Sequence, residues 1–192
     1  MNYPIMIDLM GKEITVIGGG KIAYRKVNNF LKFGYEVTVV SREFIEDFKK
    51  IENKIKIIKD EYSEKYIKDS FIVVAATNNK KVNESIGMFC RSNNKLVNVI
   101  DDQKLSNFIV PSCVKRGDLV ISISTGGKSP SLASKIRKDL EIQYDDSYEE
   151  YLILLGELRE QILEKYNNPS IRKDLLNKII NLNYDELKKL EI

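Results

Sequence analysis

Two adjacent carboxylates, Asp101 and Asp102, end an apolar run in the segment LVNVIDD. The 192-residue chain contains no histidine, so acid or base chemistry would rest on Asp, Glu, Lys or Tyr side chains. Ligands of open parallel sheets bind outside the carboxyl ends of the strands, where this pair would lie. Adjacent aspartates also form Asx-turns or helix caps. Asn98 adds a polar side chain to the otherwise apolar run, which is consistent with a catalytic site and with a turn. The pair therefore predicts either a catalytic site or a turn.

The segment VIGGGKIA contains a second candidate site. Gly18, Gly20 and Ala23 match the pattern G-x-G-x-x-A directly after an apolar run and before a helical pattern. Glycine at 18 permits a tight turn, and glycine at 20 lets the backbone approach a pyrophosphate. The helix N-terminus would supply N–H groups and the positive end of a dipole. This context favours a dinucleotide site over a glycine-rich turn without a ligand.

The residues after the second apolar run bear on the choice of cofactor. An acid at its end is missing, and the chain has Ser41 and Arg42 there, with Glu43 next. A carboxylate would bind the ribose hydroxyls of NAD, whereas an arginine could accept the 2′-phosphate of NADP. Arg42 could equally be a solvated loop charge. This position alone does not decide between NAD and NADP.

A third candidate site is the segment ISTGGKSP, whose GKS imitates the end of a phosphate loop. A Walker A sequence needs a glycine where this chain has Ser122, so a nucleoside triphosphate site is excluded. Ser124, Thr125 and Lys128 precede an expected helix N-terminus, which suits an anionic ligand such as a carboxylate. A plain helix cap is the alternative, and the local sequence slightly favours it.

Five short β-branched runs, with helical patterns between them, must position these groups. Runs that are apolar almost throughout are typical of strands buried on both faces, and their alternation with helices predicts a parallel sheet covered by helices. Ala23 and Val27 share one face of the first helical pattern, and Gly34 supplies its stop. The expected strands are Ile14–Gly18, Glu36–Val40, Ile55–Ile58, Phe71–Ala76 and Leu96–Ile100.

The pattern changes after Asp102. The segments 108–114 and 118–125 predict two strands, and everything beyond Asp146 has a helical pattern. The sequence therefore predicts an α/β fold: a Rossmann-type domain over 1–107, a small α+β region over 108–144 and a helical region over 145–192. The expected helix starts are Ser129 with Pro130, a capping box of Ser147 and Glu150, Asn168 with Pro169, and Asn183 with Glu186.

The composition excludes several classes of protein. A net charge of +3, with basic and acidic residues interspersed, argues against nucleic acid as a partner. No apolar stretch approaches the ~20 residues that span a bilayer, and the start lacks signal-peptide features, so a cytoplasmic protein with no membrane contact is expected. Cys90 and Cys113 form no CxxC pair, so neither a disulfide framework nor a zinc site is expected.

Together, these motifs resemble the precorrin-2 dehydrogenase family, the dehydrogenase and ferrochelatase modules of siroheme synthases. The resemblance covers about residues 3 to 141, and the later residues match only in being helical. It implies an NAD-dependent oxidation of precorrin-2 to sirohydrochlorin, on the route to siroheme or another modified tetrapyrrole. It also implies a homodimer, with residues 108–144 as the dimerisation region. The shared motifs are YPIMIDLMGK, VIGGGKIAYRKV, VVAATNN, VNVIDD and FIVPSCVKRGDLVISISTGGKSP, in this order.

The resemblance also implies roles for single residues. Asp101, rather than Asp102, takes the position of the family's essential acid. The turn at Ser124 lines the tetrapyrrole pocket, and Lys128 and Arg116 are suited to the carboxylates of the substrate. The implied cofactor residues are Gly18, Gly20, Lys21, Ile22, Ser41, Arg42, Glu43 and Thr77, and the implied substrate residues are Ser124, Thr125, Gly126, Lys128, Asn98 and Arg116.

Two questions stay open at this point. Some members of the family also insert ferrous iron into sirohydrochlorin, and the absence of histidine does not exclude this activity because the macrocycle nitrogens supply most of the ligands. No resident metal ligand is expected. The alternative to an enzyme is a non-catalytic, NAD-sensing Rossmann module, which would explain the glycines but not the TGGKSP turn or Asp101.

Overall fold

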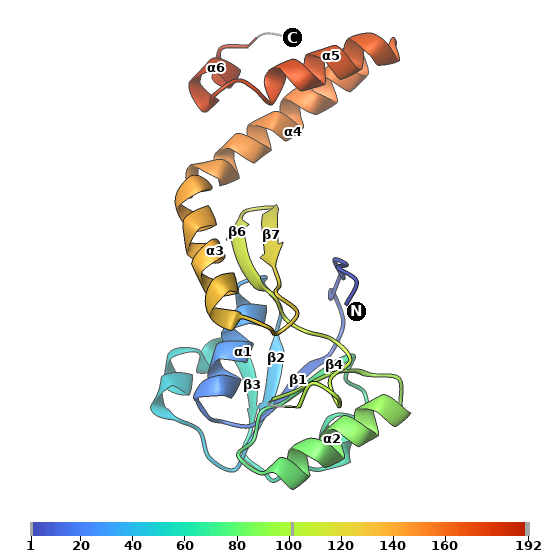
Figure 1. Cartoon of the computed structure of the whole chain (residues 1–192), viewed down its shortest axis with the longest axis vertical. Coiled ribbons are helices and arrows are strands. Elements are labelled where there is room, and N and C mark those ends of the chain that lie inside the picture. The colour runs from blue at the N-terminus through green and yellow to red at the C-terminus, as the bar shows by residue number, and fades with distance from the viewer. Residues whose placement is uncertain (1, 101, 191–192) are drawn as a thin grey trace. The chain divides into compact units, whose positions relative to one another are not determined.

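The computed structural model describes residues 2–100 and 102–190, which form two compact units, Met1–Ile109 and Val110–Ile192. The first unit contains a five-stranded parallel sheet with the strand order β3-β2-β1-β4-β5 (Figure 1). This is the Rossmann-like α/β fold that the alternation of strands and helices predicts. Its elements are β1 (Ile14–Ile17), α1 (Lys21–Leu31), β2 (Val37–Val40), β3 (Ile55–Ile58), β4 (Ile72–Ala75), α2 (Lys80–Ser92) and β5 (Leu96–Val99).

The two faces of this sheet are buried under different helices. Successive strand residues point to opposite faces, so Val16 and Ile17 of β1 belong to different apolar clusters. Val16 packs in the cluster that contains Val27 of α1, and Ile17 packs in the one that contains Ile86 of α2. Figure 1 shows α1 and α2 on opposite sides of the sheet. Burial on both faces explains why these strands are almost entirely apolar.

The connections on either side of β3 are shorter than the alternation predicts. The chain forms only 3-10 helices there, η1 (Glu46–Lys50), η2 (Glu52–Lys54) and η3 (Glu64–Tyr66). β3 is only partly buried, because it lies at the edge of the sheet. The expectation of a covering helix is therefore wrong at these two connections. Phe48 and Ile51 fill the core before β3, and Ile67 fills it after β3.

The second unit begins with an antiparallel pair, β6 (Ser112–Arg116) and β7 (Leu119–Ile123), in which Val114 lies opposite Ile121. The prediction of a strand from residue 108 is wrong in its first four residues. Pro111 has no N–H to donate, and the strand begins directly after it. The turn between the two strands requires Gly117, whose φ is 53°.

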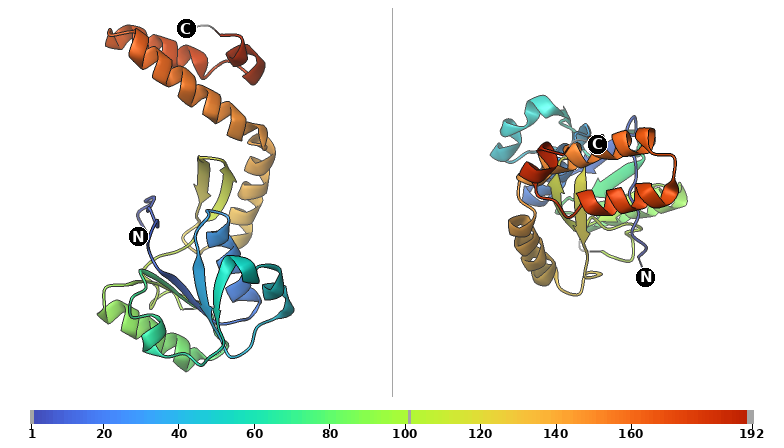
Figure 2. Two further views of the ribbon diagram at one scale, coloured as in Figure 1. Left: turned by 180° about the vertical axis from the view of Figure 1, so that it is seen from behind. Right: turned by 90° about the horizontal axis from the view of Figure 1, so that it is seen from above.

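Four helices complete the second unit: α3 (Pro130–Gln143), α4 (Ser147–Lys165), α5 (Pro169–Ile179) and α6 (Tyr184–Lys188). α5 and α6 pack back on α4, as Figure 2 shows, around a buried cluster of Leu158, Ile162, Ile179 and Leu187. None of the helices described in residues 2–100 and 102–190 is long and apolar enough to cross a membrane.

The helix starts follow the predicted caps with one exception. Ser129, Asn168 and Asn183 are N-caps whose side chains accept N–H bonds, and Asn183 forms a capping box with Glu186. The expected capping box at Ser147 is wrong. Ser147 is already the first residue of α4, and its N–H donates to the carboxylate of Asp145 at 3.0 Å. An acid two residues before the helix thus takes the role expected of the serine.

Candidate functional site

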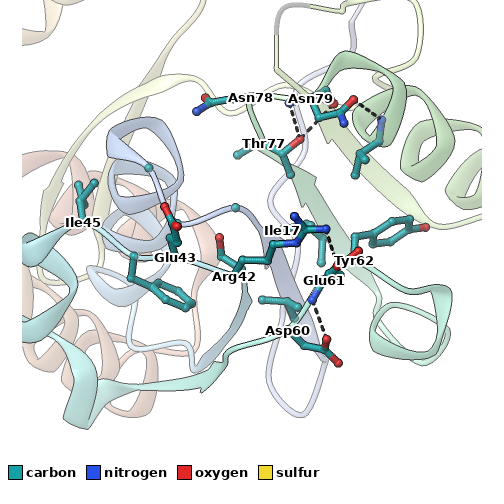
Figure 3. Close-up of a pocket in the computed structure, with 18 residues that line it drawn as sticks. Ile17, Arg42, Glu43, Ile45, Asp60, Glu61, Tyr62, Thr77, Asn78 and Asn79 are labelled. Atoms are coloured by element: carbon teal, nitrogen blue, oxygen red, sulfur yellow. Dashed lines mark hydrogen bonds and ion pairs between the residues drawn. The ribbon is translucent and has the colours of Figure 1, made fainter.

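A pocket of about 650 Å³ opens at the carboxyl ends of the parallel strands in the first unit (Figure 3). Its walls come from the ends of β1, β2 and β4 and from the loops that follow β2 and β3. This is where an open α/β sheet binds its ligand. The lining residues are Ile17, Gly18, Gly19, Gly20, Val40, Ser41, Arg42, Glu43, Phe44, Ile45, Asp60, Glu61, Tyr62, Ala76, Thr77, Asn78, Asn79 and Val82.

The glycine turn forms the floor of this pocket, and its three glycines have different roles. Gly18 has a φ of 128°, and a Cβ there would collide with the carbonyl oxygen of Ala76. A Cβ on Gly19 would collide with the carbonyl oxygen of Glu43. Gly20 faces open space and is the N-cap of α1 without a side-chain cap. Gly18 and Gly19 thus permit packing, and Gly20 leaves room for a ligand.

The first turn of α1 offers unpaired backbone N–H groups to that open space. An α-helix leaves its first four N–H groups without intrahelical partners, and they attract anions such as a pyrophosphate. Lys21 and Ile22, the first residues of α1, do not line the pocket with their side chains; their backbone belongs to this turn. Gly19 was missed by the sequence prediction, although the run of three glycines was a signal for it.

The loop after β2 is tied to the glycine turn. The N–H of Ile45 donates to the carbonyl oxygen of Gly19 at 3.0 Å, so Ser41, Arg42 and Glu43 are held along the pocket wall. The guanidinium of Arg42 pairs with the carboxylate of Glu61, and this hydrogen bond raises the pKa of Arg42. Arg42 extends across the pocket to Glu61 in Figure 3.

A buried amide organises the loop after β4. Oδ1 of Asn83 accepts the N–H of Thr77 at 3.1 Å and its hydroxyl at 2.7 Å, and Nδ2 donates to the Thr77 carbonyl at 2.9 Å. Asn83 is only 6% exposed. Thr77 was predicted to bind the cofactor, and it does line the pocket. Asn83, which fixes its position, was missed because no sequence pattern marks the bonds of its amide to the loop six residues earlier.

The structure describes one of the two adjacent aspartates after β5, Asp102. Asp101 lies outside the described residues. Oδ1 of Asp102 accepts the N–H groups of Lys104 at 2.9 Å and Leu105 at 3.1 Å, which is an Asx-type turn. Asn98, expected to contact the substrate, donates to the carbonyl oxygen of Phe108 at 3.3 Å. The turn interpretation therefore applies to Asp102.

The TGGKSP turn lies in the second unit, between β7 and α3. Ser124 Oγ accepts the N–H of Gly126 at 3.1 Å, and Thr125 Oγ1 accepts the N–H of Ser129 at 3.1 Å. Gly126 has a φ of 61°, which glycine adopts without strain. The Lys128 side chain is exposed. The two hydroxyls thus shape the turn, and the turn presents a cation at the start of α3.

Arg116 is held by contacts within the second unit. Its Nε lies 3.0 Å from a carboxylate oxygen of Asp146, and its other nitrogens donate to the carbonyl oxygens of Lys115 at 2.9 Å and Glu141 at 3.3 Å. Its side chain is 18% exposed. These bonds join β6, the end of α3 and the start of α4, so Arg116 has at least a structural role.

Across the described ranges, 2–100 and 102–190, there is no group of three or more His, Cys, Asp or Glu side chains that could hold a metal ion. The charged side chains that line the pocket are those of Arg42, Glu43, Asp60 and Glu61. The structure brings six of the eight predicted cofactor residues to the pocket, namely Gly18, Gly20, Ser41, Arg42, Glu43 and Thr77.

Two family models match this chain. The family model described as "Putative NAD(P)-binding" matches residues 5–112, and the one described as "Sirohaem biosynthesis protein central" matches residues 116–143. A solved structure titled "SirC, precorrin-2 dehydrogenase" superposes with a TM-score of 0.77 at 32% identity, covering 98% of this chain and 96% of that one.

Two curated relatives differ in how much of their own length this chain matches. The precorrin-2 dehydrogenase of Priestia megaterium is 34% identical over 184 residues, which are 95% of this chain and 91% of that protein. The siroheme synthase of Ruthia magnifica is 38% identical over 176 residues, which are 90% of this chain and 37% of that protein. The chain thus spans little more than a third of the siroheme synthases it matches.

Proposed function

The chain belongs to the precorrin-2 dehydrogenase family, and from this premise we propose that it oxidises precorrin-2 to sirohydrochlorin with NAD, in siroheme biosynthesis. The observation that carries the proposal is the pocket at the strand ends, where Gly20 leaves open space in front of the α1 N-terminus. Such an N-terminus stabilises a pyrophosphate through its N–H groups and its dipole.

The residues of the pocket fit a dinucleotide. The floor at Gly18 and Gly20 would hold the pyrophosphate, and the loop at Ser41 and Glu43 offers polar groups to the adenosine ribose. When bound, the nicotinamide supplies a two-electron hydride acceptor. Thr77, fixed by Asn83, lines the pocket on the β4 side. Each of these groups comes from the first unit, so the cofactor site is built within one domain.

Removing a hydride from the macrocycle also requires that a proton leave, and we assign the acceptor to Asp101. Its place in sequence, two residues after the end of β5, corresponds to the carboxyl end of a parallel strand. The neighbouring Asp102 already accepts two backbone N–H groups. A carboxylate is a competent general base, and the chain has no histidine to take the role.

The substrate side of the proposal rests on charge. Precorrin-2 is a polycarboxylate, and the turn from Ser124 to Lys128 presents an exposed cation next to the α3 N-terminus. Such a site suits a carboxylate. Asn98 and Arg116 belong to the same proposal as substrate contacts. Homodimer formation through residues 108–144 and a cytoplasmic location, where the dinucleotide pool is available, complete it.

An anaerobic incubation with precorrin-2 and NAD tests this function. We expect the absorbance of sirohydrochlorin to appear together with NADH. The proposal is wrong if a folded protein that binds NAD produces neither, with NAD or with NADP.

A further inference from the structure

Two acids after β3 line the dinucleotide pocket, and nothing in the glycine motif predicts them. β2 and β3 are paired in parallel with Val40 opposite Ile58, and the N–H of Ser41 donates to the carbonyl oxygen of Ile58 at 3.1 Å. The chain therefore leaves both strands at the same level of the sheet. The loop after β3 runs beside the loop after β2, which places Asp60 and Glu61 at the pocket wall.

Arg42 is the single cation among the described residues that line this pocket, and three carboxylates face the same space. The carboxylates are those of Glu43, Asp60 and Glu61. Glu61 pairs directly with the Arg42 guanidinium, as Figure 3 shows. The Asp60 carboxylate lies 3.6 Å from Nζ of Lys65, which offsets part of its charge.

Asp60 keeps its charge because its neighbours stabilise the ionised form. Its carboxylate accepts a hydrogen bond from the Tyr66 hydroxyl and one from the N–H of Glu61 at 2.7 Å, and these bonds hold the pKa of Asp60 below its usual range. The N–H bond also fixes the backbone from which the Glu61 side chain projects.

In this class of fold the residues after the second strand meet the adenosine ribose, and an arginine there accommodates the 2′-phosphate of NADP. We propose, on the basis of the proposed function, that Glu61 makes the site selective for NAD by keeping the Arg42 guanidinium paired and away from a 2′-phosphate. Glu61 is therefore a specificity-determining residue, and it lies on a different strand connection from the one that usually carries this role.

The size of the effect follows from the exposure of the pair. The side chains of Arg42 and Glu61 are 69% and 66% exposed, so solvent screens their attraction and the pair is weak by itself. A 2′-phosphate would bring nearly two negative charges, with oxygens that match the guanidinium fork. Removing the Glu61 charge both frees that fork and reduces the repulsion.

The test is calorimetric binding of NAD and NADP to the full chain, independent of turnover. We expect Glu61→Gln to tighten NADP binding by roughly three- to tenfold while NAD binding changes by less than about twofold. Glu64→Gln is the matched control, because it removes the same charge three residues further on, outside the pocket lining. It should leave both dissociation constants unchanged.

The double variant Arg42→Gln with Glu61→Gln separates the two contributions. The gain for NADP should be lost to a large extent when the guanidinium is absent. The proposal is overturned if Glu61→Gln changes the ratio of the NADP and NAD dissociation constants no more than Glu64→Gln does. It is also overturned if the gain in NADP binding persists in full without Arg42.

Because Glu61 is exposed, the thermal unfolding of the variant should be unchanged, and Glu61→Ala provides a second variant with the same expectation. A protein without precorrin-2 turnover can still pass this test, so the two proposals fail separately.

Discussion

At the scale of single residues, the two adjacent aspartates have become distinguishable. Asp102 uses its carboxylate to accept the backbone N–H groups of Lys104 and Leu105, and such local bonds stabilise a turn. Asp101 lies outside the described residues, and its catalytic role stays a prediction that rests on its position after β5 and on the family pattern. Substitutions of these two aspartates are therefore expected to have opposite effects on turnover and stability.

Asp101→Ala is expected to abolish precorrin-2 oxidation while NAD binding is unchanged, because the removed group accepts a proton and does not hold the cofactor. Asp102→Ala is expected to keep most of the turnover and to lower the free energy of unfolding by about 1–2 kcal/mol through the lost turn bonds. Steady-state kinetics, NAD titration and denaturant unfolding of both variants check this. An active Asp101→Ala together with an inactive Asp102→Ala would show that the assignment is off by one residue.

At the scale of elements, the turn between β1 and α1 makes the sharpest prediction. Gly20→Ala should cost at most about 1 kcal/mol of stability, the cost of alanine at an N-cap. Gly20 has an extended backbone with a φ of −89°, and no atom lies within 4 Å of the position that a Cβ would take. The same methyl group would occupy the space of the pyrophosphate, so NAD binding should weaken about tenfold, which is ~1.4 kcal/mol.

Gly18→Ala is the contrasting variant. It should lower the free energy of unfolding by more than about 2 kcal/mol, because the positive φ and the collision with Ala76 both oppose a side chain. Thermal unfolding and NAD titration of the two variants distinguish the roles. Equal loss of stability in both would contradict the view that Gly20 is reserved for the ligand.

The inner face of α2 predicts a dependence of stability on pH. Burial raises the pKa of the Cys90 thiol to about 11, from an ordinary value of 9.0. The folded state thus holds this proton more tightly than the unfolded state, and its contribution is complete below pH 9 and is lost as the pH rises through 11. The free energy of unfolding should fall by about 1–3 kcal/mol over this range.

The control for this prediction is Cys90→Ala, which lacks the titrating group. The difference in unfolding free energy between the wild type and this variant should shrink between pH 9 and pH 11. Chemical denaturation at several pH values measures it. A difference that is independent of pH would show that the thiol titrates normally in the fold.

The elements also show which features were predictable from sequence. The apolar strands, the glycine turn and the Asn183 cap follow from local patterns, and the structure confirms them. Asp60 and Glu61 were not predicted as site residues, because their place beside Arg42 depends on the pairing of β2 with β3. Asn83 was not predicted because its bonds to Thr77 depend on how the loop after β4 folds back on α2. Two starts were predicted a few residues off. The apolar run from residue 108 predicted a strand that Pro111 delays, and Ser147 with Glu150 imitated a capping box although Ser147 is already in the helix.

At the scale of the whole molecule, the two proposed binding sites belong to different compact units. The first holds every residue of the dinucleotide pocket, and the second holds the turn from Ser124 to Lys128. The proposed reaction therefore draws on residues of both units. The single change Lys128→Gln should raise the KM for precorrin-2 severalfold, about 1 kcal/mol, by removing the charge that we propose to contact the substrate carboxylates. It should leave the KM for NAD unchanged.

Kinetics with each substrate varied in turn check this prediction, and Lys138→Gln on α3 is a matched control outside the turn. An equal rise in KM for precorrin-2 in both variants would show a general charge effect and not a local contact. The same preparations allow an iron-insertion assay with sirohydrochlorin, which separates a dehydrogenase from an enzyme with both activities.

The most direct test of the central claim is to follow sirohydrochlorin and NADH together in one anaerobic reaction of the full chain with precorrin-2 and NAD. We predict that the two products appear at equal rates and in equal amounts, since each hydride removed from the macrocycle must reach the nicotinamide. Asp101→Ala should form neither product while it still binds NAD. Binding of NAD without formation of either product by the wild type would contradict the account and would favour an NAD-sensing module.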